Sequence, residues 1–140
     1  PVYGALYNWF AVEAGNLCPA GWHVPSDAEF GTLEVYLGLA PADVDIWGWR
    51  GTDQGTEMKS TTGWTIGNGT NTSGFSALAG GYRYGLSGTY NDRGNLSYWW
   101  SSSQETGLLA WYRRLDGTNA DIYRASVNKT GGKYVRCMKN

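Results

Sequence analysis

The sequence predicts an α+β domain in which small antiparallel sheets, one main helix and one short helix are joined by long ordered loops. Three observations lead to this fold class: one clear helical pattern, strand and turn patterns in the last third of the chain, and a middle region dominated by Gly, Thr, Ser and Asn. The 140 residues include 21 Gly, 8 Trp and 10 Tyr. Because Trp rings can pin loops onto a core and Gly permits sharp turns, this composition is typical of a loop-rich binding domain.

The first part of the chain contains the main helical signal. Residues 3–12 are rich in large apolar side chains, and we expect them to form an early strand with its turn. Ser26 and Glu29 then make a capping-box pattern, and apolar side chains recur behind it at helical spacing. Because Gly38 can end a helix in a left-handed conformation, the main helix is predicted over residues 27–37.

A short second helix is predicted over residues 41–46, because Pro41 is favoured at the first helical position. Residues 47–97 are polar and rich in Gly, with a few embedded Trp side chains. Long ordered loops of this kind are usually functional, and we expect the Trp rings to hold them on the core.

The last third of the chain alternates strand and turn signals. The Asp-Gly pair at 116–117 separates two strand-like runs and is a hairpin signal. A second turn is expected over residues 128–132, where two Gly residues adjoin. Four strands are predicted, over residues 97–102, 110–115, 121–124 and 133–138.

Length, charge and hydropathy limit the function. A chain of this length is expected to form one domain over residues 1–140. Its formal net charge is −1, which argues against nucleic-acid binding because that needs a clustered basic face. No apolar run reaches the roughly 18–20 residues of a membrane span, so no membrane insertion is expected. The chain opens inside an apparent structural element, and we therefore expect a domain excised from a longer exported protein.

Cys18 and Cys137 lie near the two ends of the chain and are its two cysteines. Together with a single His they are too few for a zinc site. We favour a disulfide, which would close a loop of about 120 residues and contribute about 5 kcal/mol by the chain-entropy estimate. The alternative is two buried free thiols. A disulfide favours an oxidising, extracytoplasmic location.

The sequence contains no evident catalytic constellation. His23 has no nameable nucleophile beside it and is expected to be a packed, hydrogen-bonded histidine. The Gly-x-Ser-x-Gly elbow and a phosphate-loop Lys are both missing. We therefore expect no catalytic residue, no cofactor and no metal. A hydrolase or oxidase that uses Asp53, Glu57 and Asp92 is a weaker alternative.

The two-residue period of strands predicts two distinct faces on the hairpin around residues 116–119. The side chains expected to face inward are Trp111, Arg113, Leu115, Ile122 and Arg124. Those expected to face outward are Tyr112, Arg114, Asp116, Asp121, Tyr123 and Ala125. Because Tyr and Arg are enriched at binding hot spots, we predict a ligand-binding surface here. The alternative is an ordinary solvated sheet face. The candidate ligand-binding residues, with the flanking loops, are Tyr90, Asn91, Gln104, Glu105, Tyr112, Arg114, Asp116, Asn119, Asp121 and Tyr123.

Several motifs follow one another along nearly the whole chain: Leu17–Ser26 before the main helix, Trp49–Asp53, Ser73–Leu78 with Gly80–Arg83, Tyr98–Ser102, Ala110–Arg113 and Val135–Cys137. Together they resemble the Fibrobacter succinogenes major paralogous domain. The chain departs from that pattern at Gly132-Lys133-Tyr134, where family members often have an aromatic and a small residue. We expect this departure to alter local packing. The resemblance implies a C-type lectin-like fold, with paired N- and C-terminal strands, in an exported or surface protein.

Some domains of this kind are the variable proteins of diversity-generating retroelements in phages and bacteria, and residues 90–136 fit that layout. The resemblance implies a fixed scaffold there, made of Trp99, Trp100, Trp111, Arg113, Arg124 and Arg136. Calcium-dependent sugar binding is not expected, because the Glu-Pro-Asn or Gln-Pro-Asp tripeptide is missing and Tyr90-Asn91-Asp92 is a faint echo of the Trp-Asn-Asp motif. Relatives that oxidise a sulfatase cysteine need a reactive cysteine pair, whereas the two cysteines here look structural.

These observations together predict a non-catalytic domain that binds a cell-surface protein or glycan through its C-terminal strands and loops. The predicted location is extracellular or at the cell surface. The alternative is a structural or adhesive module of a bacterial surface protein, whose outer face packs on neighbouring domains. The sequence leaves the oligomeric state open.

Overall fold

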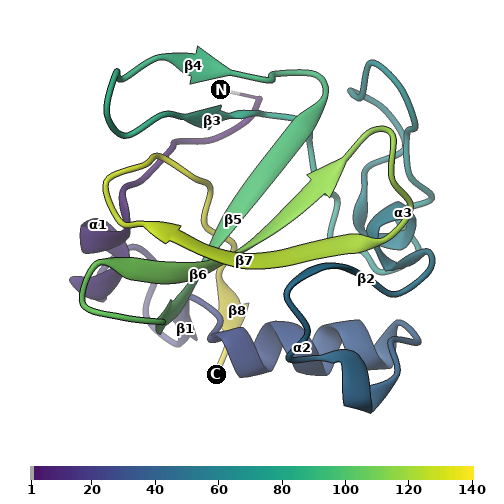
Figure 1. Ribbon diagram of the computed structural model, residues 1–140, viewed down its shortest axis with the longest axis horizontal. Helices are drawn as coiled ribbons and strands as arrows, with labels where there is room; N and C mark the ends of the chain where they lie inside the picture. Colours follow the sequence, from purple (N-terminus) through teal and green to yellow (C-terminus); the bar gives the residue numbers. More distant parts are fainter. Residues whose placement is uncertain (1) are drawn as a thin grey trace.

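The computed structural model describes residues 2–140, which form an α+β architecture around a four-stranded antiparallel sheet (Figure 1). The strand order is β2-β7-β6-β5, with β2 at Gly48–Arg50, β5 at Leu96–Gln104, β6 at Leu109–Asp116 and β7 at Ile122–Asn128. The predicted hairpin is confirmed as β6 and β7, in which Arg113 pairs with Arg124. Two shorter antiparallel pairs flank this sheet: β1 (Trp22–His23) with β8 (Met138–Lys139), and β3 (Tyr82–Arg83) with β4 (Tyr90–Asn91).

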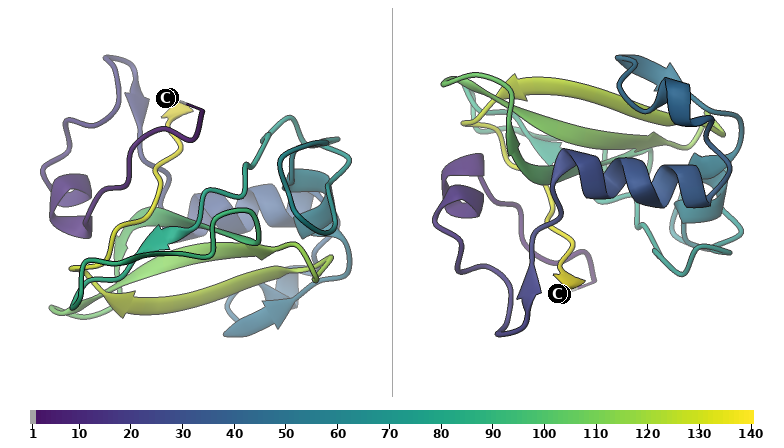
Figure 2. Two further views of the ribbon diagram at one scale, coloured as in Figure 1. Left: turned by 90° about the horizontal axis from the view of Figure 1, so that it is seen from above. Right: turned by 90° about the horizontal axis from the view of Figure 1, so that it is seen from below.

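Helix α2, Asp27–Tyr36, lies across one face of the main sheet (Figure 2) and confirms the main predicted helix. Its capping box is complete. The Ser26 hydroxyl accepts a hydrogen bond from the Glu29 backbone N–H at 3.2 Å, and the Glu29 carboxylate accepts one from the Ser26 backbone N–H at 2.8 Å. The helix stops where Gly38 takes a φ of 96°.

The predicted strand over residues 3–12 is wrong in its second half. Helix α1, Trp9–Glu13, forms there because the Asn8 side chain accepts a hydrogen bond from the Ala11 backbone N–H at 3.1 Å. Trp9 and Val12 lie one turn apart and both enter the core. Local capping therefore overrides the strand-like run of apolar residues.

The middle region contains short elements that its polar composition hides. Helix α3, Gln54–Met58, and strand β2 both fall in the stretch predicted as loop, so the expectation of one main and one short helix is wrong. A Cβ at Gly55 would overlap the carbonyl oxygen of Asp121, so Gly is what lets α3 approach the β6–β7 turn. The predicted short helix over residues 41–46 is a single 3-10 turn, η1, at Pro41–Asp43.

The predicted last strand over residues 133–138 is also mostly wrong. Lys133 and Tyr134 make isolated bridges to Tyr7 and Trp99, and a regular ladder returns at β8. Because β8 pairs with β1, the two ends of the chain meet, as the family resemblance implied.

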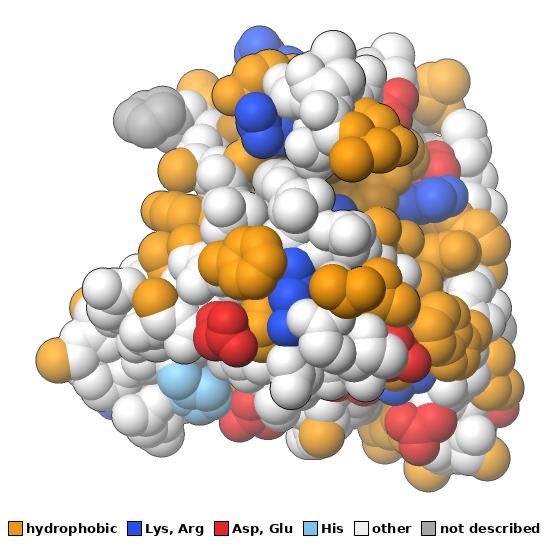
Figure 3. Space-filling view, turned by 60° about the vertical axis from the view of Figure 1, so that its left-hand side comes forward, with side chains coloured by type: hydrophobic (Ala, Val, Ile, Leu, Met, Phe, Trp, Pro, Cys, Tyr) orange, Lys and Arg blue, Asp and Glu red, His pale blue; other side chains and the backbone are white. Residues whose placement is uncertain are grey.

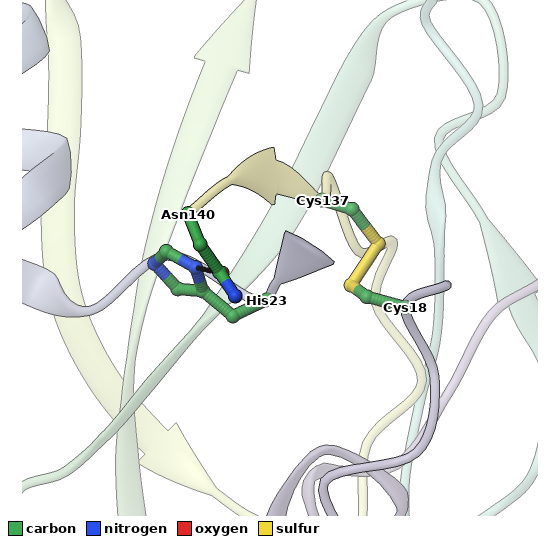
Figure 4. Close-up of a disulfide and its surroundings, with 4 residues drawn as sticks. All are labelled: Cys18, His23, Cys137 and Asn140. Carbon is green, nitrogen blue, oxygen red and sulfur yellow. Dashed lines mark hydrogen bonds between the residues drawn. A yellow bond between two sulfur atoms is a disulfide. The ribbon is translucent and has the colours of Figure 1, made fainter. Parts of the chain in front are cut away.

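Cys18 and Cys137 form a disulfide beside the β1–β8 pair, with their Cα atoms 5.7 Å apart (Figure 4). The predicted pairing of these cysteines is therefore confirmed, and the alternative of two free thiols is wrong. The bond joins residues 119 positions apart in the sequence. It cross-links the segment before β1 to the segment before β8.

Two clusters of buried side chains form the core, and strand alternation places them on opposite faces of β5 and β6. The cluster on the α2 face contains Phe30, Met58, Trp64, Ala77, Ala79, Trp99, Leu115 and Ile122. The other contains Trp9, Val12, Val24, Trp100 and Ala110. The Trp64 ring N–H donates to the Ala77 carbonyl at 2.9 Å, which confirms that this ring pins a loop. Trp47, expected to do the same, is 54% exposed.

A buried ion cluster ties α2 to the sheet. Arg113 donates from Nε to Glu34 Oε1 and from Nη1 to Asp27 Oδ1, both at 2.5 Å. Arg124 Nη2 donates to Asp27 Oδ2 at 2.6 Å, and Arg50 hydrogen-bonds the second oxygen of Glu34. Burial alone raises the pKa of Asp27, but Arg124 and Arg113 outweigh it and hold that pKa below its ordinary value.

His23 is hydrogen-bonded through both ring nitrogens, as expected, but its side chain is 38% exposed, so the expectation of a packed histidine is wrong. Nδ1 lies 2.6 Å from Asn140 Oδ1 and Nε2 lies 2.9 Å from Glu29 Oε1, and Figure 4 shows the Asn140 side chain beside the imidazole ring. Two acceptors favour the doubly protonated ring. Asn140 and then Glu29 therefore raise the pKa of His23.

Glu34→Gln is expected to lower the free energy of unfolding by about 3–5 kcal/mol, because it leaves Arg113 and Arg50 buried without their carboxylate. Urea unfolding followed by Trp fluorescence measures the change. Glu105→Gln, at an exposed position, is the matched control and should stay within about 0.5 kcal/mol of the wild type. A Glu34→Gln variant as stable as this control would contradict a structural role for the cluster.

Asn140→Ala is expected to lower the pKa of His23 toward 6.5, because it removes the larger of the two effects that raise it. In the wild type, the contribution of His23 to stability is complete below about pH 6.5 and fades as the pH rises through the raised pKa. Proton NMR follows the titration without ambiguity, since the chain has one His. Lys139→Ala is the control. A wild-type pKa at or below 6.5 would show that these hydrogen bonds do not form in solution.

Candidate functional site

The face of the main sheet turned away from α2 carries a row of stacked side chains. We call it the aromatic face and define it as Trp49, Tyr98, Tyr112, Arg114 and Tyr123. The Arg114 guanidinium carbon lies 4.8 Å from the ring centroid of Trp49 and 4.7 Å from that of Tyr123. The Tyr112 ring centroid is 5.7 Å from that of Tyr98 and 6.2 Å from that of Tyr123. The register explains this row, because Arg114 pairs with Tyr98 on one side and Tyr123 on the other.

The aromatic face is cationic at Arg114 and neutral at its phenols. Arg114 Nη2 lies 3.5 Å from Asp116 Oδ2, while its Nε is buried and has no hydrogen-bond partner among residues 2–140. Burial, followed by the neighbouring Tyr123, raises the pKa of Tyr112 to about 12. The Tyr112 phenol therefore keeps its proton at neutral pH and can donate a hydrogen bond to a ligand.

The predicted alternation of the hairpin is largely confirmed. Arg113, Leu115, Ile122 and Arg124 are all buried on the α2 face. Trp111, also predicted inward, is half-buried, with the Arg124 guanidinium carbon 3.7 Å from its ring centroid.

The predicted outward residues are less exposed than expected. Tyr112, Arg114 and Tyr123 are half-buried, and Ala125 is buried. The β3–β4 hairpin accounts for part of this cover, since the Tyr82 ring centroid lies 4.8 Å from that of Tyr98. The aromatic face is thus a lined recess rather than a fully solvated sheet face.

The structure brings some predicted site residues together and separates others. Tyr112, Arg114 and Tyr123 form the aromatic face, and Asp116 adjoins them. The other predicted residues lie outside it, on the turns and the second hairpin: Gln104, Glu105, Asn119, Asp121, Tyr90 and Asn91.

Gln104 and Glu105 are exposed at the end of β5 that lies opposite the β6–β7 turn. Tyr90, in β4, is 75% exposed, whereas Asn91 beside it is half-buried. These two belong to a separate two-stranded sheet.

The polar residues of the β6–β7 turn shape the turn itself. Asp116 Oδ1 accepts a hydrogen bond from the Thr118 backbone N–H at 2.8 Å. Lys59 Nζ donates to the backbone carbonyls of Asp116 at 3.0 Å and Asn119 at 2.9 Å. The Asp116 carboxylate and these carbonyls are therefore engaged within the fold, which leaves the aromatic rings and Arg114 as the stronger candidates for ligand contact.

Sequence reasoning missed two members of the aromatic face and its most unusual neighbour. The sequence predicts that Trp49 pins a loop, and it gives Tyr98 no surface role. Lys133 lines a cavity of about 340 Å³ beside the aromatic face. Figure 3, which brings the left-hand side of Figure 1 forward, shows hydrophobic side chains next to Lys and Arg side chains on that side of the molecule. The strand period could have placed Tyr98, but its pairing register with β6 is not readable from sequence.

The acidic and metal-ligating residue types do not assemble into a centre within residues 2–140. No three His, Cys, Asp or Glu side chains there are grouped as metal ligands would be. Over the same range, no helix is both long enough and apolar enough to cross a membrane.

Comparison with known proteins gives one match. A family model described as the Fibrobacter succinogenes major domain matches residues 1–139. No curated protein and no solved structure matches the chain.

Proposed function

The chain belongs to the Fibrobacter succinogenes major domain family, and we propose that it is a non-catalytic ligand-binding domain with a C-type lectin-like fold. The aromatic face is its proposed binding surface, with the neighbouring loops at its rim. The ligand that we propose is a cell-surface protein or glycan. The pairing of the chain ends at β1 and β8, together with loops resting on a small sheet, supports the lectin-like assignment.

The observation that carries this proposal is the cluster of Trp49, Arg114 and Tyr123. The Arg114 guanidinium carbon lies 4.8 Å from the ring centroid of Trp49 and 4.7 Å from that of Tyr123, and the two rings meet edge to face at an interplanar angle of 72°. Tyr112 and Tyr123 have half-buried rings, and neither phenol oxygen is a fully buried unpartnered atom among the described residues, so both can reach a ligand. Rigid aromatic surface with free polar tips is the residue chemistry of binding hot spots.

The rigid backing of this face supports a second part of the proposal, that its outward side chains tolerate diversification. Trp99, Trp100, Arg113 and Arg124, four of the six expected scaffold residues, are buried. Trp111 is half-buried, and Arg136 is exposed with its guanidinium on the Phe75 carbonyl. Substitutions on the outward face therefore leave most of the scaffold contacts intact.

The proposed location is extracellular or at the cell surface. The Cys18–Cys137 disulfide supports it, because such bonds persist in oxidising compartments. A surface location would also place the aromatic face where it can meet the proposed ligands.

A structural or adhesive module is the second candidate function. Trp47 and Ile46 favour it, because both are large, about half exposed and outside the aromatic face. Neighbouring domains packed on those side chains would need no ligand at the aromatic face.

Simultaneous replacement of Tyr112, Arg114 and Tyr123 by Ala is expected to weaken ligand binding at least about 100-fold, since hot-spot truncations cost about 2 kcal/mol or more each. The wild-type chain is first screened against arrays of glycans and of cell-surface proteins, and each hit is measured again with the triple variant by surface plasmon resonance. Tyr36→Ala, at an 83% exposed position on α2, is the matched control.

Full-strength binding of every hit by the triple variant would show that the aromatic face is not the site. Loss of binding in a Trp47→Ala variant, with the triple variant unaffected, would instead support the adhesive module. Thermal unfolding of each variant separates loss of binding from loss of fold.

A further inference from the structure

The cavity of about 340 Å³ beside the aromatic face lies between β3, β6 and the loop that follows β7. Its walls include the rings of Tyr82, Tyr98 and Tyr112 and the aliphatic side chains of Leu86 and Val127. We call it the tyrosine cavity. Its volume is in the range of small-molecule sites, which are mostly apolar with a few placed polar groups.

Lys133 projects its ammonium group among these rings. Its Nζ lies 4.4 Å from the ring centroid of Trp100, 5.0 Å from that of Tyr112 and 5.3 Å from that of Tyr98. The backbone of Lys133 is fixed by two hydrogen bonds with Tyr7, at 2.8 and 3.0 Å. This bridge holds the backbone in place, and the side chain is 4% exposed.

Lys133 differs from the two other buried lysines. Lys59 donates to two backbone carbonyls of the β6–β7 turn, at 3.0 and 2.9 Å. Lys129 donates to Gln104 Oε1 at 2.9 Å and to a backbone carbonyl at 3.1 Å. Lys133 Nζ has no hydrogen-bond acceptor among residues 2–140, and it is not one of the fully buried unpartnered atoms there, so its tip is open to the cavity.

Lys133 has no anionic partner among the described residues of the cavity. Burial lowers its pKa to about 7, and ring faces compensate part of the lost hydration. The charged and titratable side chains that line the cavity with it are Tyr82, Arg83, Tyr84, Tyr98 and Tyr112. No carboxylate is among the described lining residues, so an anionic group entering the cavity would meet an unpaired amine.

The tyrosine phenols add donors around this amine. The phenols of Tyr82, Tyr98 and Tyr112 make no hydrogen bond to residues 2–140, and none of these three oxygens is a fully buried unpartnered atom there, so they are open to the cavity. Because burial keeps the phenols of Tyr98 and Tyr112 protonated, they can donate to an anionic oxygen. The Lys133 amine and these phenol donors suit an anionic oxygen, and the ring-lined, mostly apolar walls suit a ring-shaped body, so the cavity fits a carboxylate carried on a ring.

We propose that the tyrosine cavity binds a small monocarboxylate with a ring-shaped body, whose carboxylate pairs with Lys133 and whose ring packs against Tyr98 and Tyr112. This goes beyond the proposed surface function, because such a ligand needs no macromolecular partner. An aromatic acid and a sugar acid share this chemistry. Both carry one carboxylate on a ring that an aromatic side chain can stack against.

The test is an NMR titration of the isotopically labelled chain at pH 6.5 with two probe pairs. Phenylacetate is compared with 2-phenylethanol, and glucuronate with glucose, so that each pair differs in the carboxylate. At least one acid is expected to bind at least about tenfold more tightly than its neutral analogue. The acid that shows this preference indicates whether the ligand is an aromatic acid or a sugar acid. Binding of neither acid, or binding of inorganic phosphate in preference to both, would overturn the proposal.

Lys133→Met keeps the apolar stem and removes the amine, and it is expected to weaken the binding acid at least about tenfold. Lys129→Met, which removes a buried lysine outside the cavity, should leave that affinity unchanged. Unchanged affinity in Lys133→Met would assign the binding elsewhere.

A measurement on the wild type keeps the proposal testable if Lys133→Met fails to fold. The carboxylate requires the ammonium form, so affinity should be level below pH 7 and fall about tenfold for each pH unit above it. Calorimetry in two buffers, at a pH one unit above the Lys133 pKa measured from its ε-carbon resonance, should detect proton uptake on binding. The 13C resonance of the Lys133 ε-carbon should show its pKa rising on binding. Binding without proton uptake would exclude Lys133 as the partner of the carboxylate.

Discussion

The buried pairing of two carboxylates with three guanidinium groups is the constraint on which the rest of this structure depends. Asp27 and Glu34 lie on α2, whereas Arg113, Arg124 and Arg50 come from three neighbouring strands. Buried charges tolerate little displacement, because each one that loses its partner keeps its desolvation cost. The cluster therefore fixes both the position of α2 on the sheet and the register in which Arg113 faces Arg124. Packed apolar side chains alone would fix these less sharply.

The ion cluster also determines which side chains face the other side of the sheet. Arg113 and Arg114 are consecutive in β6, so anchoring the first toward α2 turns the second toward the aromatic face. The same alternation separates Trp99, in the α2-side core, from Tyr98. The disulfide and the β1–β8 pair then close the chain ends at a separate place. The aromatic face is thus held partly by residues that point away from it and partly by Trp100, against which Tyr112 packs on the same side of the sheet.

Sequence patterns predicted the elements whose signals are local. The capping box of Ser26 and Glu29 marked α2, and Asp-Gly marked the β6–β7 turn. The two-residue strand period then predicted that Arg113 and Arg124 face inward. It did not predict that they form ion pairs with Asp27 and Glu34. Long-range strand pairing could not be predicted from the sequence. Strand β2 has three residues, and its position beside β7 depends on the pairing register, which no local pattern specifies. For the same reason, Tyr112, Arg114 and Tyr123 were found, whereas Trp49 and Tyr98 were missed.

Lys133 shows how the surroundings of a residue become clear only in three dimensions. In the sequence it follows two Gly residues and resembles any solvated lysine near a turn. The bridge to Tyr7 and the rings of Trp100, Tyr98 and Tyr112 enclose it instead. Tyr98 and Tyr112 belong both to the aromatic face and to the tyrosine cavity. A small acid in the cavity and a macromolecule on the face would therefore touch the same two rings, and any effect of one on the affinity of the other must be reciprocal.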